Sequence, residues 1–546
     1  MRTLINKTVL FCTSVTLYLF SGCTGDFENM NIDPLAPTDV SPSLLLPKMQ
    51  EFGFNCPMWQ YQIGESLYTN QYAQYIACST AGFPTDRYGW NDQFVKESFW
   101  YDYYLYIPKN LLTVKDQLEE HPEYNNLYQI MRILGVLTAS RTTDLFGDMP
   151  YFDGGKGLSD AAYDSQKDIY YAFFNELDEA VKYLKEHIHD ADQYSYGTSD
   201  LFYNGDISKW IKLGNSLRLR LALRISFVDP EKAKTEGEAA LRGELLSSND
   251  DTAGIPQVST NMGHSLWTIC FWDEFRVSKT MIDIMLYESS IEDPRLPLHF
   301  SQTQGYAAGE YEKKWQGLPN GLPANMIRND AYPDYLPKNT SCIWGYNSCG
   351  NWNAKTSLTE AEKASGPSQL YGLIEKPLIV FNYPEVCFLK AEAAIRGWSG
   401  AGEAKSNYET GIRASFEDAR QNVDASYYVT DYKAENDDIY IDGGNVKWDN
   451  AADFETKLKK IITQKWIAIY PNGVEAWSEF RRTGYPLFNP VVACDIDDIK
   501  AGEFIKKLRY IDDERSLNPN ALSPGINNNQ GDGPNVRVWW DTKRYK

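Results

Sequence analysis

Hydrophobic residues recur every three or four positions along most of this chain, which is the spacing of amphipathic helices. One such stripe lies in 165–187, where Ser165 and Asp168 form a variant capping box at the start. Near the N-terminus, Ser41 and Pro42 are typical of a helix start. The same spacing predicts further helices at 97–121, 125–147, 207–227, 385–398, 401–419 and 454–470.

These helices are predicted to pack in antiparallel pairs. Trp210, Leu213 and Gly214 match the W-x2-L-G start of a tetratricopeptide unit. The spacing between successive pairs is irregular, so no strict repeat is expected. The pattern therefore predicts a mainly α fold, with a tetratricopeptide-like scaffold of helical pairs over about 41–247 and 377–546.

Two stretches break the helical pattern. Residues 248–376 are rich in glycine, proline, asparagine and aromatic side chains, and 80–93 has a similar composition. Long irregular insertions in a helical protein are where binding function tends to reside. We expect one domain over 41–546, in which the loop-rich insertion at about 248–376 forms the ligand-binding portion.

The N-terminal segment has the pattern of a signal peptide. Arg2 and Lys7 precede an apolar run at 8–20, which is too short to span a bilayer as a helix. Ser21 and Gly22 then lead directly to Cys23, whose thiol suits diacylglycerol attachment in a bacterial lipoprotein box. We expect a signal peptide over 1–22, lipidation (including palmitate) at Cys23 and a polar tether over 23–40; a plain secretory signal with an incidental cysteine is the alternative.

Charge and cysteine content narrow the function further. The chain has 546 residues and a formal net charge of −21, which argues against binding nucleic acid and against electrostatic docking on anionic lipid. Without the signal peptide and Cys23, seven cysteines remain, and an odd number excludes a complete disulfide framework within one chain. Cys342 and Cys349 are close enough to pair in a loop, whereas Cys387 lies in a helical pattern typical of a buried thiol.

Signatures of catalysis are missing from the sequence. It contains no G-x-S-x-G, H-E-x-x-H, C-x-x-C or P-loop motif, and its five histidines are scattered. With 74 acidic residues, carboxylate pairs arise by chance, so they do not indicate a glycoside hydrolase. We expect no enzyme activity, no cofactor and no metal site. A surface hydrolase and a purely structural or adhesive protein remain as alternatives.

Several charged residues have a structural explanation. Arg218, Arg220 and Arg224 alternate with leucine in one predicted helix, which favours ion pairs within the fold over phosphate recognition. Asp144 and Asp148 resemble an acid pair, but a turn after a helix explains them better.

Five blocks of sequence together resemble the SusD/RagB family of outer-membrane nutrient-binding lipoproteins. They are "FENMNIDPLAPTDVSPSLLLP" after Cys23, "RTTDLFGDMPYFD" at 141–153, "WIKLGNSLRLRLALRI" at 210–225, "YPEVCFLKAEAAIRGW" at 383–398 and "IITQKWIAIYPNGVEAWSEFRRTGYP" at 461–486. The resemblance implies a lipid-anchored protein facing the cell exterior. It also implies a partner, a SusC-type TonB-dependent transporter, and a ligand that is an oligosaccharide or, in RagB-type branches, a peptide.

Candidate ligand-binding residues follow from sugar chemistry, because pyranose C–H faces stack on aromatic rings and hydroxyls need polar partners. Two clusters combine aromatic and polar side chains in this way, and two further tryptophans are weaker candidates. The alternative is that each tryptophan packs a loop onto the scaffold. The first cluster is Asp86, Arg87, Tyr88, Trp90 and Asn91. The second is Trp344, Tyr346, Asn347, Asn351, Trp352 and Asn353, and the weaker candidates are Trp272 and Trp315.

Overall fold

The computed structural model describes residues 40–256, 265–266, 273–343, 377–421, 435–500 and 502–545. The predicted signal peptide, Cys23 and nearly all of the predicted tether lie outside these residues. The described part is mostly helical with four short strands, so the predicted fold class is confirmed. None of its helices is both long and apolar enough to cross a membrane.

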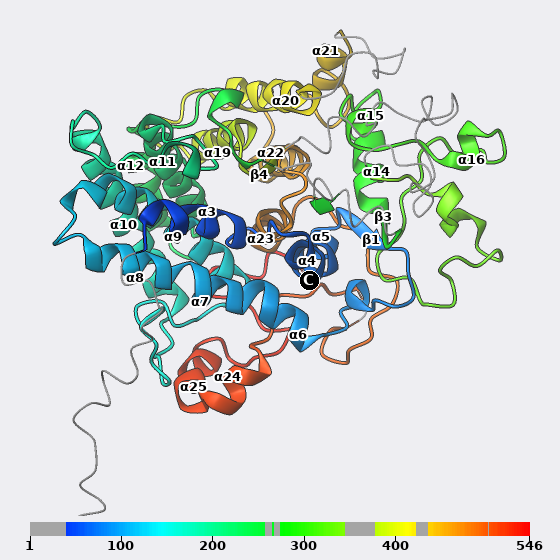
Figure 1. Cartoon of the computed structure of the whole chain (residues 1–546). Coiled ribbons are helices and arrows are strands. Elements are labelled where there is room, and N and C mark those ends of the chain that lie inside the picture. Colours follow the sequence, from blue (N-terminus) through cyan, green and yellow to red (C-terminus); the bar gives the residue numbers. More distant parts are fainter. Residues whose placement is uncertain are drawn as a thin grey trace, which may run out of the picture.

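The scaffold consists of helices that pack against their neighbours in the chain. The first group is α9 (Asn125–Phe146), α10 (Gln166–His187), α11 (Ile207–Arg224) and α12 (Pro230–Leu241), and the second is α19 (Tyr383–Ile395), α20 (Ala404–Arg420), α22 (Phe454–Ala468) and α23 (Gly473–Thr483). Figure 1 shows α9–α12 on one side of the molecule, with α23 near its centre.

The N-terminal and C-terminal segments pack around these pairs. The N-terminal helices are α3 (Pro42–Phe52), α4 (Met58–Gln60), the π-helix η1 (Tyr61–Thr69), α5 (Asn70–Tyr72), α6 (Asp92–Val95), the π-helix η3 (Lys96–Tyr101), α7 (Asp102–Tyr106) and α8 (Pro108–Gln117). Near the C-terminus lie α24 (Asp512–Leu517) and α25 (Pro519–Asn528), and α21 (Glu435–Ile441) precedes α22.

Local sequence explains how the pairs form. The Ser165 hydroxyl accepts a hydrogen bond from the backbone N–H of Asp168 at 3.1 Å, which confirms the predicted cap of α10. At Gly214 of α11, a Cβ atom would lie 2.6 Å from the Val181 side chain of α10. Only glycine permits this close approach, and Trp210, one turn earlier, is fully buried. The W-x2-L-G match therefore marks a helix contact.

Two antiparallel strand pairs connect the insertion to the scaffold. Strand β1 (Ile76–Cys78) pairs with β3 (Phe275–Val277), and β2 (Ala253–Ile255) pairs with β4 (Leu378–Phe381). The insertion is less irregular than its composition suggests, because it also contains the amphipathic helix α14 (Lys279–Tyr287) and the short helices α15 (Leu296–His299) and α16 (Gln304–Ala307). The predicted loop-rich segment thus has a helix of its own.

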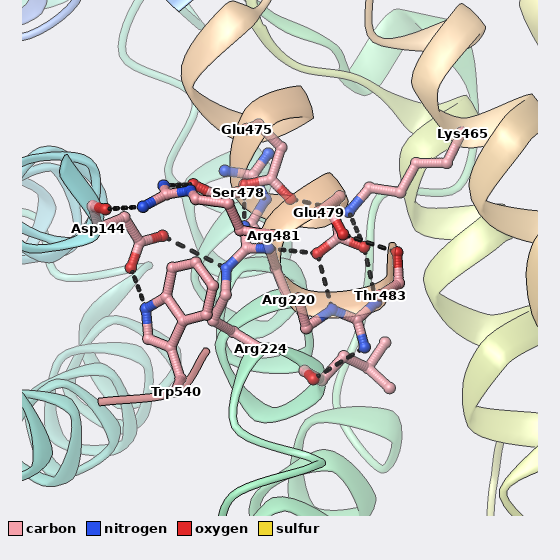
Figure 2. A network of polar contacts seen from close by, with 12 residues as sticks. Asp144, Arg220, Arg224, Lys465, Glu475, Ser478, Glu479, Arg481, Thr483 and Trp540 are labelled. Atoms are coloured by element: carbon pink, nitrogen blue, oxygen red, sulfur yellow. Dashed lines mark hydrogen bonds and ion pairs between the residues drawn. The ribbon is translucent and has the colours of Figure 1, made fainter. Parts of the chain in front are cut away.

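Buried ion pairs join the scaffold helices (Figure 2). Arg220 of α11 forms two hydrogen bonds with Glu385 of α19, at 2.8 and 2.6 Å. Arg224 contacts Glu475 at 2.5 Å and also pairs with Glu479, both on α23. The prediction that these arginines serve the fold is confirmed.

The remaining charged residues also serve the fold, although Asp144 lies in the last turn of α9 and not in the predicted turn after it. Arg218 pairs with Asp178 of α10 and Glu236 of α12. Asp144 accepts hydrogen bonds from the Tyr170 hydroxyl at 2.5 Å and the Trp540 indole at 2.8 Å. Asp148 accepts from the Gln166 backbone N–H at 2.8 Å, so it holds the start of α10. Cys387 is buried in α19, as predicted.

Candidate functional site

A cleft of about 670 Å³ opens within the insertion, beside α14. This volume is within the range of pockets that hold small ligands. Its lining combines aromatic faces with polar groups. The aromatic residues are Tyr287, Trp315 and Tyr335, and the charged or amide residues are Lys279, Asp283, Glu292, Lys313, Lys314, Gln316 and Asp334.

Helix α14 positions one wall of the cleft. Ser278 caps the helix by accepting a hydrogen bond from the Met281 backbone N–H at 3.0 Å. Met281 and Met285 face the core, while Asp283 faces the cleft. Tyr287, the last helical residue, is 72% exposed, which leaves its ring available for stacking on a ligand.

Trp315 forms a second wall. Its indole N–H donates to Glu292 Oε2 at 3.1 Å, and the Lys314 ammonium lies 5.6 Å from the centre of its ring. Only 8% of Trp315 is exposed. The structure therefore places this sequence candidate in the cleft, but as a fixed wall more than as a free stacking platform.

The third wall consists of Lys313, Asp334 and Tyr335. Asp334 accepts hydrogen bonds from Lys313 Nζ at 2.8 Å and from the Tyr311 hydroxyl at 2.6 Å. These two donors lower the pKa of Asp334 from its ordinary value. The Tyr335 ring lies nearly parallel to that of Tyr332, with centroids 6.2 Å apart, so a neighbouring ring supports it.

Most of this cleft was not predicted from the sequence. Tyr287 and Tyr335 were not among the candidates, although an exposed aromatic at the end of an amphipathic helix was a usable signal. Two of the three ion pairs link residues 21 and 22 positions apart across loops, so they could not be assigned without the fold. Among the residues that the structure describes, no group of three His, Cys, Asp or Glu side chains is arranged to hold a metal ion.

The first predicted cluster lies away from the cleft lining and is largely buried. Asp86 accepts a hydrogen bond from the Cys78 backbone N–H at 3.0 Å, and burial raises its pKa to about 6. Arg87 donates to Asp495 at 2.9 Å and to the Leu322 carbonyl at 3.1 Å. These contacts hold the 80–93 loop on the scaffold.

Two of the other three residues of this cluster are more accessible. Tyr88 is buried with a left-handed backbone (φ 67°), but Trp90 is half-buried and Asn91 is exposed. The Arg509 guanidinium lies 5.0 Å from the Trp90 ring centre, and Asn91 caps α6 through the Phe94 backbone N–H. A ligand role for the cluster stays a prediction, which depends on Trp90 and Asn91.

The second predicted cluster is not placed by the structure. Trp344, Tyr346, Asn347, Asn351, Trp352 and Asn353 lie outside the described residues, as do Trp272 and Cys349. Their roles, and the pairing of Cys342 with Cys349, stay predictions.

Comparison with known proteins decides the family. The profile described as "SusD-like: Susd and RagB outer membrane lipoprotein" matches residues 35–541. The chain belongs to the SusD/RagB family. The resemblance seen in the five sequence blocks is thereby confirmed, and with it membership of a family of outer-membrane lipoproteins.

Solved SusD homologues share the fold. A chitin-binding SusD homologue from Flavobacterium johnsoniae is 29% identical with a TM-score of 0.72, and the match covers 91% of this chain and 97% of that one. A SusD homologue from Bacteroides vulgatus is 26% identical with a TM-score of 0.74, over 92% and 98% of the two chains. A further chitin-binding protein is 27% identical with a TM-score of 0.73, over 92% and 100%. No curated protein matches the chain.

Proposed function

We propose that this SusD/RagB protein is a non-catalytic, cell-surface lipoprotein that binds a nutrient oligosaccharide in the α14 cleft and passes it to a SusC-type TonB-dependent transporter. The observation that carries the proposal is the cleft itself. Its lining includes the exposed ring of Tyr287 and the ring of Tyr335, together with acidic, basic and amide groups. Aromatic faces with convergent polar groups are what a pyranose needs for stacking and hydroxyl recognition.

The family supports this reading and suggests the first ligand to test. Two of the similar solved structures are described as chitin-binding. We therefore place oligomers of N-acetylglucosamine first among the candidate ligands. Their acetamido groups offer a donor and an acceptor that suit Gln316 and the charged lining of the cleft.

Capture without chemistry fits the state of Asp334, one of the acidic residues of the cleft. A glycoside hydrolase uses one carboxylic acid whose pKa is raised, so that it can protonate the leaving group. In the cleft, the pKa of Asp334 is shifted in the opposite direction by Lys313 and Tyr311. The carboxylate is therefore suited to accept hydrogen bonds from a ligand, and poorly suited to donate a proton.

Isothermal titration calorimetry of the full-length protein in detergent tests the proposal. The panel contains oligomers of N-acetylglucosamine, of glucose and of galacturonic acid, with peptides of similar length. We expect heat from at least one glycan series. Binding of peptides alone would instead assign the protein to the peptide-binding, RagB-type branch.

A further inference from the structure

The charged side chains of the cleft balance one another. Among the described residues, the lining contains three lysines and three carboxylates. Each lysine lies against one of these carboxylates. The pairs are Lys279 with Asp283, Lys313 with Asp334 at 2.8 Å, and Lys314 with Glu292 at 3.5 Å.

Each carboxylate is also held by a neutral donor. Asp283 accepts a hydrogen bond from the Asn489 amide at 3.0 Å, and Glu292 accepts one from the Trp315 indole at 3.1 Å. The Tyr311 hydroxyl serves Asp334 in the same way, at 2.6 Å. These second contacts hold the carboxylates in place, so that a ligand meets a fixed set of compensated charges.

This balance is notable on a chain whose formal net charge is −21. A uronic acid entering the cleft would need a free cation, but each described lysine of the lining already neutralises a carboxylate. A ligand with ammonium groups has the converse problem. Each of these two charged ligands must break an existing ion pair or leave its own charge uncompensated. Both alternatives cost binding free energy.

An uncharged sugar avoids that cost. Its hydroxyl and amide groups can accept from the paired ammonium groups and donate to the paired carboxylates while the net charge stays zero. We propose that the cleft selects uncharged oligosaccharides and discriminates against uronic acid oligomers and against oligomers of free amino sugars. The inference rests on the proposed function, since it specifies the ligand class of the same site.

Three glycan series of equal length test the selectivity by calorimetry on the full-length protein. In mildly acidic buffer, N-acetylglucosamine oligomers are neutral, glucosamine oligomers are cationic and galacturonic acid oligomers are anionic. We expect the neutral series to bind about tenfold or more tightly than either charged series at low ionic strength, because uncompensated charge in a partly enclosed site costs on this scale.

A reciprocal pair of variants moves the preference in opposite directions. Glu292→Gln leaves Lys314 without its carboxylate but keeps an acceptor for Trp315, and it should raise the affinity for the anionic series about threefold. Lys314→Gln leaves Glu292 without this lysine, and it should raise the affinity for the cationic series about threefold. Glu310→Gln is the matched control, because Glu310 pairs with Lys338 at 3.1 Å outside the cleft lining.

The possible outcomes separate this inference from the proposed function. A charged series that binds as tightly as the neutral one overturns the selectivity and leaves glycan binding intact. Equal shifts in Glu292→Gln and in Glu310→Gln also overturn it, since the effect would then not come from the cleft. Silence from all three series overturns glycan binding itself.

Discussion

Two sets of ion pairs in this molecule bring cations and carboxylates together in opposite settings. In the scaffold core, Arg482 forms two hydrogen bonds with Glu392, both at 2.7 Å, and also binds Glu479; all three side chains are at most 3% exposed. In the cleft, Lys313 and Asp334 are 40% and 45% exposed. The core set is buried in the scaffold, where Figure 2 shows Glu479 beside the neighbouring Arg224 and Glu475, and the cleft set faces solvent.

The difference shows that burial decides what an ion pair does. A buried pair that loses one partner leaves an uncompensated charge in a poorly polarisable interior, so the pair fixes how the helices dock. An exposed pair contributes little to stability because water and salt screen it. Its importance lies in the charge that it presents to a ligand. The core pairs therefore specify the scaffold, and the cleft pairs specify what binds.

The largest expected effect comes from breaking the core set. Arg482→Met removes one of the cations that neutralise Glu392 and Glu479, which also pair with Arg396 and Arg224 respectively. We expect the free energy of unfolding, measured by urea denaturation, to fall by about 3–5 kcal/mol, because two carboxylates would stay buried without this partner.

Arg413→Met is the control for this change. Arg413 pairs with Asp438 at 2.6 Å, but the two side chains are 51% and 66% exposed. Its loss should lower the free energy of unfolding by at most about 1 kcal/mol. Similar losses in the two variants would contradict the comparison.

Acid should weaken the core set. Burial alone would raise the pKa of Glu475, but Arg224, Lys465 and Arg220 outweigh it and lower the pKa to about 2. Because the folded pKa lies below the ordinary value of 4.5, the folded state binds this proton less readily than the unfolded chain. The stabilisation is therefore complete above pH 4.5 and is lost as the pH falls toward 2.

A single carboxylate with such a shift contributes about 3 kcal/mol. We expect the free energy of unfolding to fall through this pH window, as measured by urea denaturation at successive pH values. In Glu475→Gln, this part of the pH dependence should disappear. An unchanged slope in that variant would show that other carboxylates dominate acid unfolding.

Local patterns in the sequence predicted most of the scaffold, although the predicted helices did not include α12 or α23. Periodicity located the long helices, the Ser165 cap starts α10 as predicted, and Gly214 marks a close contact between helices. The alternation of Arg218, Arg220 and Arg224 with leucine also predicted structural ion pairs. Each of these signals is contained within about one to two turns of a helix, where neighbours in sequence are neighbours in space.

The cleft could not be predicted in the same way. Trp315 was a candidate because of its residue type. Its contact with Glu292, 23 positions earlier, depends on how the intervening chain folds back. Asp86 and Tyr88 have a binding-site composition, yet they are buried. Residue type indicates which side chains suit a sugar, whereas exposure depends on the path of the loops.

Tyr287→Ala tests the cleft side of the comparison and should have the smallest effect of these changes. Tyr287 is 72% exposed, so the folded scaffold gains little from its ring, while a stacked sugar would cover it. We expect the affinity for N-acetylglucosamine oligomers, measured by calorimetry, to fall by about 1–2 kcal/mol, the scale of the apolar area that stacking buries. The free energy of unfolding should stay within about 0.5 kcal/mol of the wild-type value.

Tyr306→Ala is a matched control, because Tyr306 is 43% exposed on α16 and does not line the cleft. It should leave glycan affinity unchanged. This result would be the converse of that expected for Arg482→Met, which should mainly lower the free energy of unfolding. If Tyr287→Ala and Tyr306→Ala weaken binding equally, or if Tyr287→Ala leaves the affinity unchanged, then ligand capture does not depend on stacking at α14, and the search for the site moves to Trp90 and Asn91.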